Sequence, residues 1–369
     1  MLALVAGIVA SCTPAASRAT TSTTTSSSTT STTLPPSTST SSTSTTTTTT
    51  TIPQSFQVAP TATFNVSEPD ATTETPQCST TPGRFFQVEV RYPVLAGDSQ
   101  AHPGAPYPVI VFAHGFAVTP DTYVELLDAW VQAGFVVVAP IFPDENAYMV
   151  DKYGGPSSPA ANCLEHDELN EPGDIPATLD ELGALAKKGS HSPLSGLVDM
   201  KRIGLAGQSD GGNVMAALAF DSAQYKAQLA ALPTRPRAVA ILSGQAMPGT
   251  TVPYTASSAS PPLLMVQSNA DTCNLPGTAT TLYGYLQADP TRWFVELLGA
   301  QHLPPYTGGD PSHFAVVAKV TTEFFELELG WRSQGLTASS VSAAGTSPNI
   351  AQVYTTTVPS IPNPQTVYC

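Results

Sequence analysis

Ser209 lies at the centre of the segment 207–211, which reads Gly-Gln-Ser-Asp-Gly. An apolar run at 203–206 precedes this segment, and a helix-compatible run at 212–220 follows it. This order predicts a strand, a tight turn and a helix, with the serine hydroxyl projecting from the turn. The two flanking glycines are expected where a Cβ atom would collide with neighbouring backbone. The pattern indicates a serine placed to act as a nucleophile.

A serine hydroxyl is a weak nucleophile unless a base takes its proton and an acid orients that base. Reacting groups in parallel sheets gather beyond the carboxyl ends of the strands, so residues that directly follow apolar runs are the first candidates. Asp271 follows the run 262–267, and His302 follows the run 292–298. We expect Asp271 to be buried against His302 and to hold it in the tautomer whose free nitrogen faces Ser209.

Other titratable residues compete for these two roles. His313 follows Asp310 near the start of the last expected helix, and it is the main alternative base. Asp289 precedes a strand, which is the wrong end of the sheet for the acid. The remaining histidines lie in loops or turns, where a structural role is the more common one; they are His102, His166 and His191.

A serine nucleophile also needs backbone N–H groups that stabilise the negative oxygen of the tetrahedral intermediate. Asp210, directly after the serine, opens the expected helix, where backbone amides point outwards. The second donor is expected in the segment 114–116, which reads His-Gly-Phe after the apolar run 109–113. We assign this role to the amide of Phe116. The alternative for His114-Gly115 is a plain turn.

Apolar strand-like runs alternate with helix-like segments along most of the chain, which predicts an α/β fold with a mainly parallel sheet and helices on both faces. The expected strands are 85–93, 109–113, 135–139, 203–206, 238–242, 262–267 and 292–297, and the expected helices are 121–133, 174–186, 212–220, 281–286 and 313–329. The segment 141–173 is long and acidic. It is expected to be either a functional lid or a solvated excursion, and it has no recognisable calcium-ligand spacing.

Composition divides the chain of 369 residues into four parts. Residues 1–12 resemble a signal segment that ends in a bacterial lipoprotein box, and 13–75 include a Ser/Thr/Pro-rich stretch that predicts a disordered tether. Residues 76–330 form the expected catalytic domain, and 331–369 are expected to extend over its surface. The net charge of −14 argues against a nucleic-acid partner, and no stretch reaches the length of about 20 apolar residues that a membrane-spanning helix needs.

The five cysteines suggest two kinds of covalent attachment. Cys12 ends the small-residue sequence Val-Ala-Ser-Cys after an apolar run, so we expect it to be lipidated, with the membrane as partner and an extracellular or cell-surface location. An ordinary secretory signal with an incidental cysteine is the alternative. The other four suggest two disulfides in an exported protein, for which three pairings are open. We favour Cys163–Cys273 and Cys78–Cys369, from the placement of their loops.

Over residues 84–328 the chain resembles the α/β-hydrolase family. Within it, the chain looks like the secreted branch of cutinase-like polyester hydrolases, platelet-activating-factor acetylhydrolase-like enzymes and chlorophyllase-like esterases. The resemblance rests on 109–116, on 207–212, on Asp271 and on the Gly-Ala-Gln-His sequence at 299–302. It implies a serine esterase that uses Ser209, His302 and Asp271 and needs neither a metal ion nor an organic cofactor.

The expected substrates are carboxylic esters, with lipid-like and polyester substrates as candidate classes. Two departures from the polyester hydrolases concern the substrate. This chain has Asp210 where they usually have Met or a similar residue, and it has no tryptophan in 244–262. Two other functions remain open on the sequence, namely a catalytically inactive binding or adhesion protein on a hydrolase scaffold and a serine peptidase.

Overall fold

The computed structural model describes residues 55–364 except 221–222 and 249–253. All of these residues belong to the second of two units, Thr49–Cys369. The predictions for residues 1–12, including Cys12, and for Cys369 therefore fall outside the described residues. None of the helices in the described part is long and apolar enough to cross a membrane.

The described chain folds as a nine-stranded sheet flanked by helices, with a separate two-stranded sheet made of β1 and β4. The strands are β1 (Gln57–Val58), β2 (Ala62–Glu74), β3 (Thr80–Arg91), β4 (Pro93–Val94), β5 (Tyr107–Ala113), β6 (Val136–Pro140), β7 (Val198–Gln208), β8 (Ala238–Leu242), β9 (Leu263–Ser268), β10 (Arg292–Leu297) and β11 (Ala351–Tyr354). The α-helices are α1 (Val124–Ala133), α2 (Ala147–Lys152), α3 (Ala161–Glu165), α4 (Glu171–Ala186), α5 (Asp210–Phe220), α6 (Lys226–Ala231), α7 (Pro276–Tyr285), α8 (Pro311–Glu328) and α9 (Ala338–Ala344). Short 3-10 turns cover Pro120–Tyr123, His166–Leu169 and Pro304–Tyr306.

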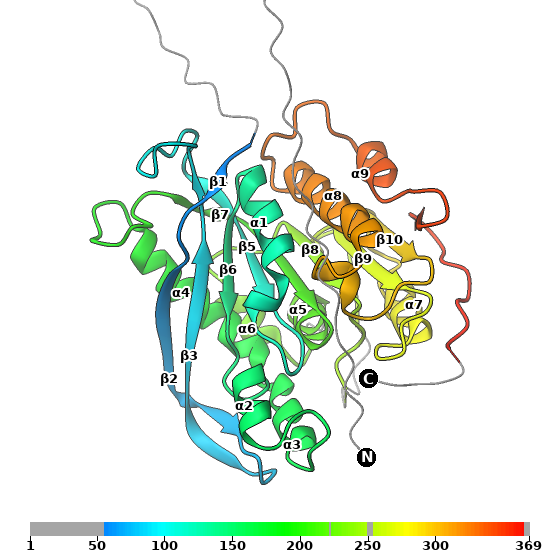
Figure 1. Cartoon of the computed structure of the whole chain (residues 1–369), viewed down its shortest axis with the longest axis horizontal. Coiled ribbons are helices and arrows are strands. Elements are labelled where there is room, and N and C mark those ends of the chain that lie inside the picture. Colours follow the sequence, from blue (N-terminus) through cyan, green and yellow to red (C-terminus); the bar gives the residue numbers. More distant parts are fainter. Residues whose placement is uncertain (1–54, 221–222, 249–253, 365–369) are drawn as a thin grey trace, which may run out of the picture. The chain divides into compact units, whose positions relative to one another are not determined.

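The large sheet is mainly parallel, with the strand order β11-β10-β9-β8-β7-β5-β6-β3-β2 (Figure 1). The six central strands β10, β9, β8, β7, β5 and β6 run parallel to one another. Among the described strands of this large sheet, antiparallel pairing occurs only towards the edges, at β2, β3 and β11. The central strands β5, β6, β8 and β9 are buried at every position, as expected for strands covered on both faces. The predicted α/β class and mainly parallel sheet are confirmed.

Helices cover both faces of the sheet (Figure 1). On one face α1 contacts α8, which in turn contacts α9, and on the other face α4, α5 and α6 contact one another. The indole N–H of Trp130 on α1 donates to Thr321 Oγ1 on α8 at 2.9 Å. A Cβ atom at Gly204 on β7 would lie 2.8 Å from the Phe325 ring. The glycine therefore allows α8 to pack closely on the strand that carries the serine turn.

Two segments outside the predicted catalytic domain contribute strands to the large sheet. β2 lies within 13–75, which the sequence analysis assigned to a disordered tether, and it pairs along most of its length with β3. Its sequence is polar and Thr-rich because it forms one edge of the sheet, where Val66 and Glu74 are its only buried residues. The expected C-terminal surface extension likewise supplies β11, which pairs with β10 at the opposite edge.

The disulfide pairing predicted from the sequence is wrong. Cys78, in the β2–β3 turn, is bonded to Cys163 on α3, with a Cα–Cα distance of 4.7 Å. This bond excludes both Cys163–Cys273 and Cys78–Cys369. Cys273 is also disulfide-bonded. The prediction relied on loops near the proposed site, whereas the β2–β3 hairpin extends to the segment 141–173 and anchors it there.

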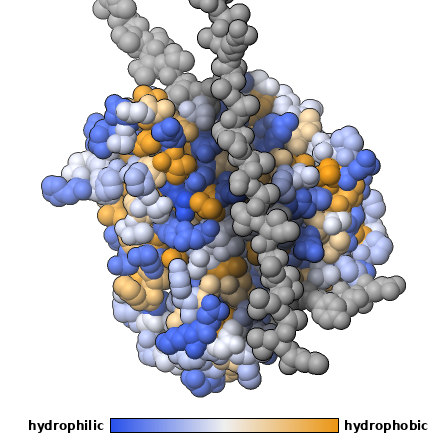
Figure 2. Space-filling model, in the orientation of Figure 1, coloured by the Kyte–Doolittle hydropathy of each residue, from blue (hydrophilic) through white to orange (hydrophobic). Residues whose placement is uncertain are grey.

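The exposed surface of the described residues is mixed in polarity. Hydrophilic and hydrophobic residues are interspersed over the uncovered part of the face in Figure 2. The large apolar side chains that are exposed belong to four different elements, β3, α1, α2 and α7; they are Phe85, Val124, Tyr148 and Tyr285. The exposed large apolar side chains are therefore spread over separate elements.

Candidate active site

Ser209 occupies a strained turn between β7 and α5. Its backbone φ angle is 56°, in the left-handed region that non-glycine residues rarely adopt. A Cβ atom at Gly207 would overlap the backbone carbonyl group of Gly211, and one at Gly211 would overlap that of Ala113. Only glycine fits at these two positions, and the half-exposed Ser209 lies between them at the end of the strand. The sequence pattern and the local structure therefore agree.

The structure brings the three predicted catalytic side chains together. His302, in the loop after β10, has its Nε2 atom 2.9 Å from Ser209 Oγ. Its Nδ1 atom lies 2.8 Å from Oδ2 of Asp271, in the loop after β9. Because a carboxylate accepts, Nδ1 carries the proton and Nε2 is left to accept from the serine hydroxyl. This arrangement can remove a proton from Ser209.

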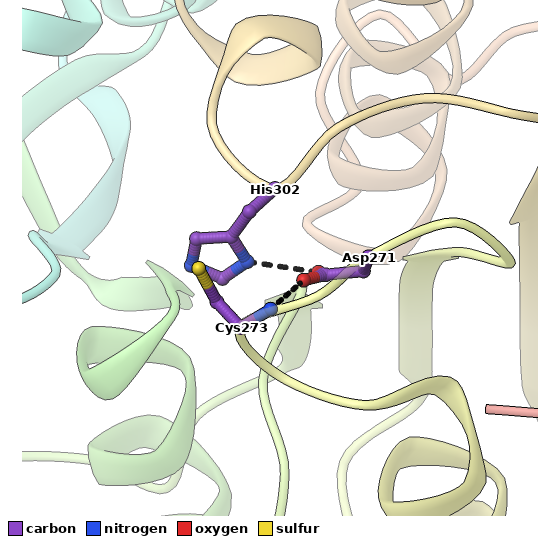
Figure 3. A group of neighbouring side chains, drawn as sticks. All are labelled: Asp271, Cys273 and His302. Carbon is purple, nitrogen blue, oxygen red and sulfur yellow. Dashed lines mark hydrogen bonds and ion pairs between the residues drawn. The ribbon is translucent and has the colours of Figure 1, made fainter. Parts of the chain in front are cut away.

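Asp271 is fully buried and held by several donors. Its Oδ1 atom accepts the backbone N–H groups of Cys273 at 2.9 Å and Asn274 at 3.1 Å. Its Oδ2 atom accepts the Gln267 side-chain amide at 3.1 Å in addition to His302. These bonds leave the carboxylate a single orientation, with one oxygen turned towards the imidazole (Figure 3).

By distance alone, a metal ion could bind between Asp271, Cys273 and His302, because their ligand atoms lie within 4.8 Å of one another (Figure 3). The chemistry of the donors does not fit this use. Cys273 is disulfide-bonded, so its sulfur is not a thiolate. The facing atoms of Asp271 and His302 are already joined to each other. The cluster is better explained as part of the serine–histidine–aspartate arrangement.

The two amides assigned to the oxyanion site have no acceptor among the described residues. The N–H of Gly115 donates to the Tyr123 hydroxyl at 3.3 Å, and the N–H of Ala117 donates to the Glu145 carbonyl at 2.8 Å. The amide of Phe116 between them makes no such bond within the described chain. Asp210 is the first residue of α5, so its N–H lacks an acceptor inside the helix.

Neither His114 nor His313 contacts Ser209. His114 is fully buried, where its Nδ1 atom contacts the Gly115 carbonyl and its Nε2 atom accepts the N–H of Phe142 at 3.1 Å. Burial lowers the pKa of His114 to about 4, so the ring stays neutral and links two loops. His313, the alternative base, contacts Asp310 Oδ2 at 2.7 Å and the Leu298 carbonyl at 3.2 Å, at the start of α8.

Sequence reasoning missed a group of buried carboxyl groups behind the serine. Glu145, Glu168 and Glu171 are buried, and Asp210 lies beside them. Burial raises the pKa of all three glutamates above the ordinary range, and the neighbouring acids raise it further. Burial also raises the pKa of Asp210 to about 7, with Glu165 adding to the shift and His302 opposing it. The three glutamates lie in the acidic segment 141–173 and Asp210 follows the serine, but nothing in their spacing indicated that they would be buried together.

Sequence reasoning also missed the side chain of Gln208, which contacts both His302 and Tyr123. Its position next to the serine was the only available signal.

In the comparisons with known proteins, no protein-family model matches this chain and no curated protein matches it significantly.

Proposed function

We propose that this protein is a serine hydrolase of the α/β-hydrolase family that cleaves carboxylic esters. The observation that carries the proposal is the continuous hydrogen-bonded path from Ser209 through His302 to Asp271. The strained serine turn between β7 and α5 and the chain order Ser, Asp, His support it. An inactive scaffold has no need to keep all three groups in contact.

In the proposed reaction, Ser209 Oγ attacks the ester carbonyl while His302 Nε2 takes the hydroxyl proton. Asp271 stabilises the imidazolium that forms. The amides of Phe116 and Asp210 donate to the oxyanion, and each such donor typically contributes about 3 kcal/mol of transition-state stabilisation. His302 then gives its proton to the leaving alcohol, and an acyl-serine remains. Water, activated by the same imidazole, releases the acid and restores Ser209.

The proposal extends to substrate class and location. Carboxylic esters, including lipid-like and polyester substrates, are the classes to test, and a series of p-nitrophenyl esters of increasing acyl length with one polyester film separates them. The sequence of residues 1–12 supports export and lipid anchoring at Cys12, with an extracellular or cell-surface location. Detergent partitioning of a Cys12→Ala variant tests the anchor, because full membrane retention of that variant contradicts it.

Labelling with a fluorophosphonate probe tests the central claim. The wild type should label at Ser209 and lose esterase activity in proportion, and Ser209→Ala should neither label nor turn over ester. Ser99→Ala changes an exposed serine in a distant turn and should behave as the wild type. Absence of labelling in the wild type, or equal labelling of Ser209→Ala, contradicts the proposal and favours a binding role. Labelling with cleavage of peptide amides in addition to esters indicates a peptidase instead.

A further inference from the structure

Gln208 is the last residue of β7 and is almost completely buried beside the serine. Its side-chain amide lies between two partners. The oxygen, Oε1, is 2.6 Å from the hydroxyl of Tyr123. The nitrogen, Nε2, is 3.3 Å from His302 Nε2 and 3.4 Å from the His302 carbonyl oxygen. The amide therefore contacts the same ring nitrogen that receives the serine proton.

The orientation of this amide follows from a backbone group in the loop after β5. The N–H of Gly115 points at the Tyr123 hydroxyl at 3.3 Å, and a backbone N–H can only donate. The hydroxyl oxygen accepts that bond, so its own proton is directed to Gln208 Oε1. Burial raises the pKa of Tyr123 above its ordinary range, so the phenol keeps this proton. The amide NH2 must then face His302.

The NH2 group can only donate, and its acceptors are His302 Nε2 and the His302 carbonyl oxygen. A lone pair on His302 Nε2, with the ring proton on Nδ1 towards Asp271, satisfies this contact, and the Ser209 hydroxyl shares that lone pair. We propose that Gln208, held by Tyr123, is a positioning residue that selects the neutral, proton-accepting form of His302. The functional meaning of this inference rests on the proposed hydrolysis. The contacts of Gln208 that support the inference do not depend on that proposal.

The contact has a defined effect on proton affinity. When His302 Nε2 gains a proton, two donors face each other at Gln208, so this contact disfavours the imidazolium. The charged groups that act on the ring are Asp271, which favours the imidazolium, and Asp210 on α5. Glu165 on α3 acts on Asp210 in turn. Changes confined to residue 208 leave these carboxyl groups in place.

Replacement of the amide by a carboxylate reverses the effect. In Gln208→Glu one oxygen still accepts from Tyr123, and the other can accept from a protonated His302 Nε2. We expect the pKa of His302 to rise by about 1 to 3 units, the usual effect of an opposite charge at this distance. The acid limb of the pH profile of kcat/KM should move up by the same amount. Gln208→Met, a neutral variant of similar length, should give a smaller rise.

The measurement is a ¹⁵N-histidine NMR titration of the full chain, in which a His302→Gln variant identifies the His302 signals. It also reports the tautomer, with the proton on Nδ1 expected in the wild type. An unchanged His302 pKa in Gln208→Glu overturns the inference, as does a wild-type ring with its proton on Nε2. If Gln208→Glu does not fold, Gln208→Met and Tyr123→Phe carry the test, and an unchanged pKa in both overturns the inference.

The titration requires no turnover, so the two proposals fail separately. A protein that cleaves no ester but shows the expected shift loses the proposed function and keeps the assignment of Gln208. A protein that cleaves esters but shows no shift keeps the function and loses the assignment.

Discussion

The carboxyl groups of Glu145 and Glu171 face each other in the protein interior. Both residues are fully buried, and none of their four carboxyl oxygens accepts a hydrogen bond from an N–H or O–H group of the other described residues. Two buried carboxylates without a paired cation repel each other strongly, so the pair must retain a proton. The pair also lies near the oxyanion segment, because the Glu145 carbonyl accepts the N–H of Ala117. These acids therefore lie close to the candidate site, and their protonation bears on the stability of the fold.

This pair predicts that the folded protein loses stability as the pH rises. Burial raises the pKa of Glu145 and of Glu171 above the ordinary value of 4.5, so between that value and the folded pKa the native state holds more protons than the unfolded state. Under that condition the free energy of unfolding falls with increasing pH. The stabilisation is fully present below the ordinary pKa and is lost as the pH passes through the folded pKa.

Glu145→Gln removes one of the two charges and should flatten this dependence. We expect urea denaturation to give nearly equal stability for variant and wild type at pH 4. At pH 8 the variant should be more stable by about 1–3 kcal/mol, because its neutral amide avoids the cost of an unpaired buried charge beside Glu171. Glu181→Gln makes the same change at an exposed position on α4 and should have no effect at either pH. Equal loss of stability with pH in wild type and Glu145→Gln contradicts the prediction.

The serine turn predicts a sharp difference between two glycine substitutions in helices. Gly211→Ala places a methyl group into the Ala113 carbonyl, and backbone on both sides cannot move without displacing β5 or α5. We expect little soluble protein, or loss of several kcal/mol together with activity. Gly183→Ala on α4 adds a methyl that meets only the end of Met200 at 3.7 Å. It should be neutral or stabilising by about 0.5–1 kcal/mol. Similar thermal midpoints for both variants contradict the assigned geometry.

The disulfide between Cys78 and Cys163 should contribute measurably to stability. It joins positions 85 residues apart, and crosslinks of this kind restrict the unfolded chain. Cys78→Ser, Cys163→Ser and the double variant should each lose about 2–5 kcal/mol, because any one of them removes the bond. Limited proteolysis should then cut first within 141–173. A wild-type denaturation midpoint in the double variant contradicts the prediction.

The sequence by itself determined the fold class and which three side chains meet at the candidate site. Ser209, Asp271 and His302 each directly follow an apolar run, and parallel strands bring such positions to one edge of a sheet. The runs that form β5, β6, β8 and β9 are apolar throughout because both of their faces are covered, so their pattern is visible without coordinates. The constraint on Gly207 is similarly local, because it comes from the backbone of Gly211 in the same turn, whereas Gly211 is constrained by the distant Ala113 on β5.

The tertiary structure alone decided the contacts between distant segments that carry no local pattern. Four cysteines allow three pairings, and only the reach of the β2–β3 hairpin selects Cys78–Cys163. The edge strand β2 has a polar sequence because most of its side chains are not buried, and the edge strand β11 is only four residues long, so neither was recognised from composition. The facing of Glu145 and Glu171 and the direction of the Gln208 amide depend on which groups surround them after folding. Periodicity reports which side of an element is buried, but a hydrogen bond or an ion pair depends on the position of a partner that the chain supplies from elsewhere.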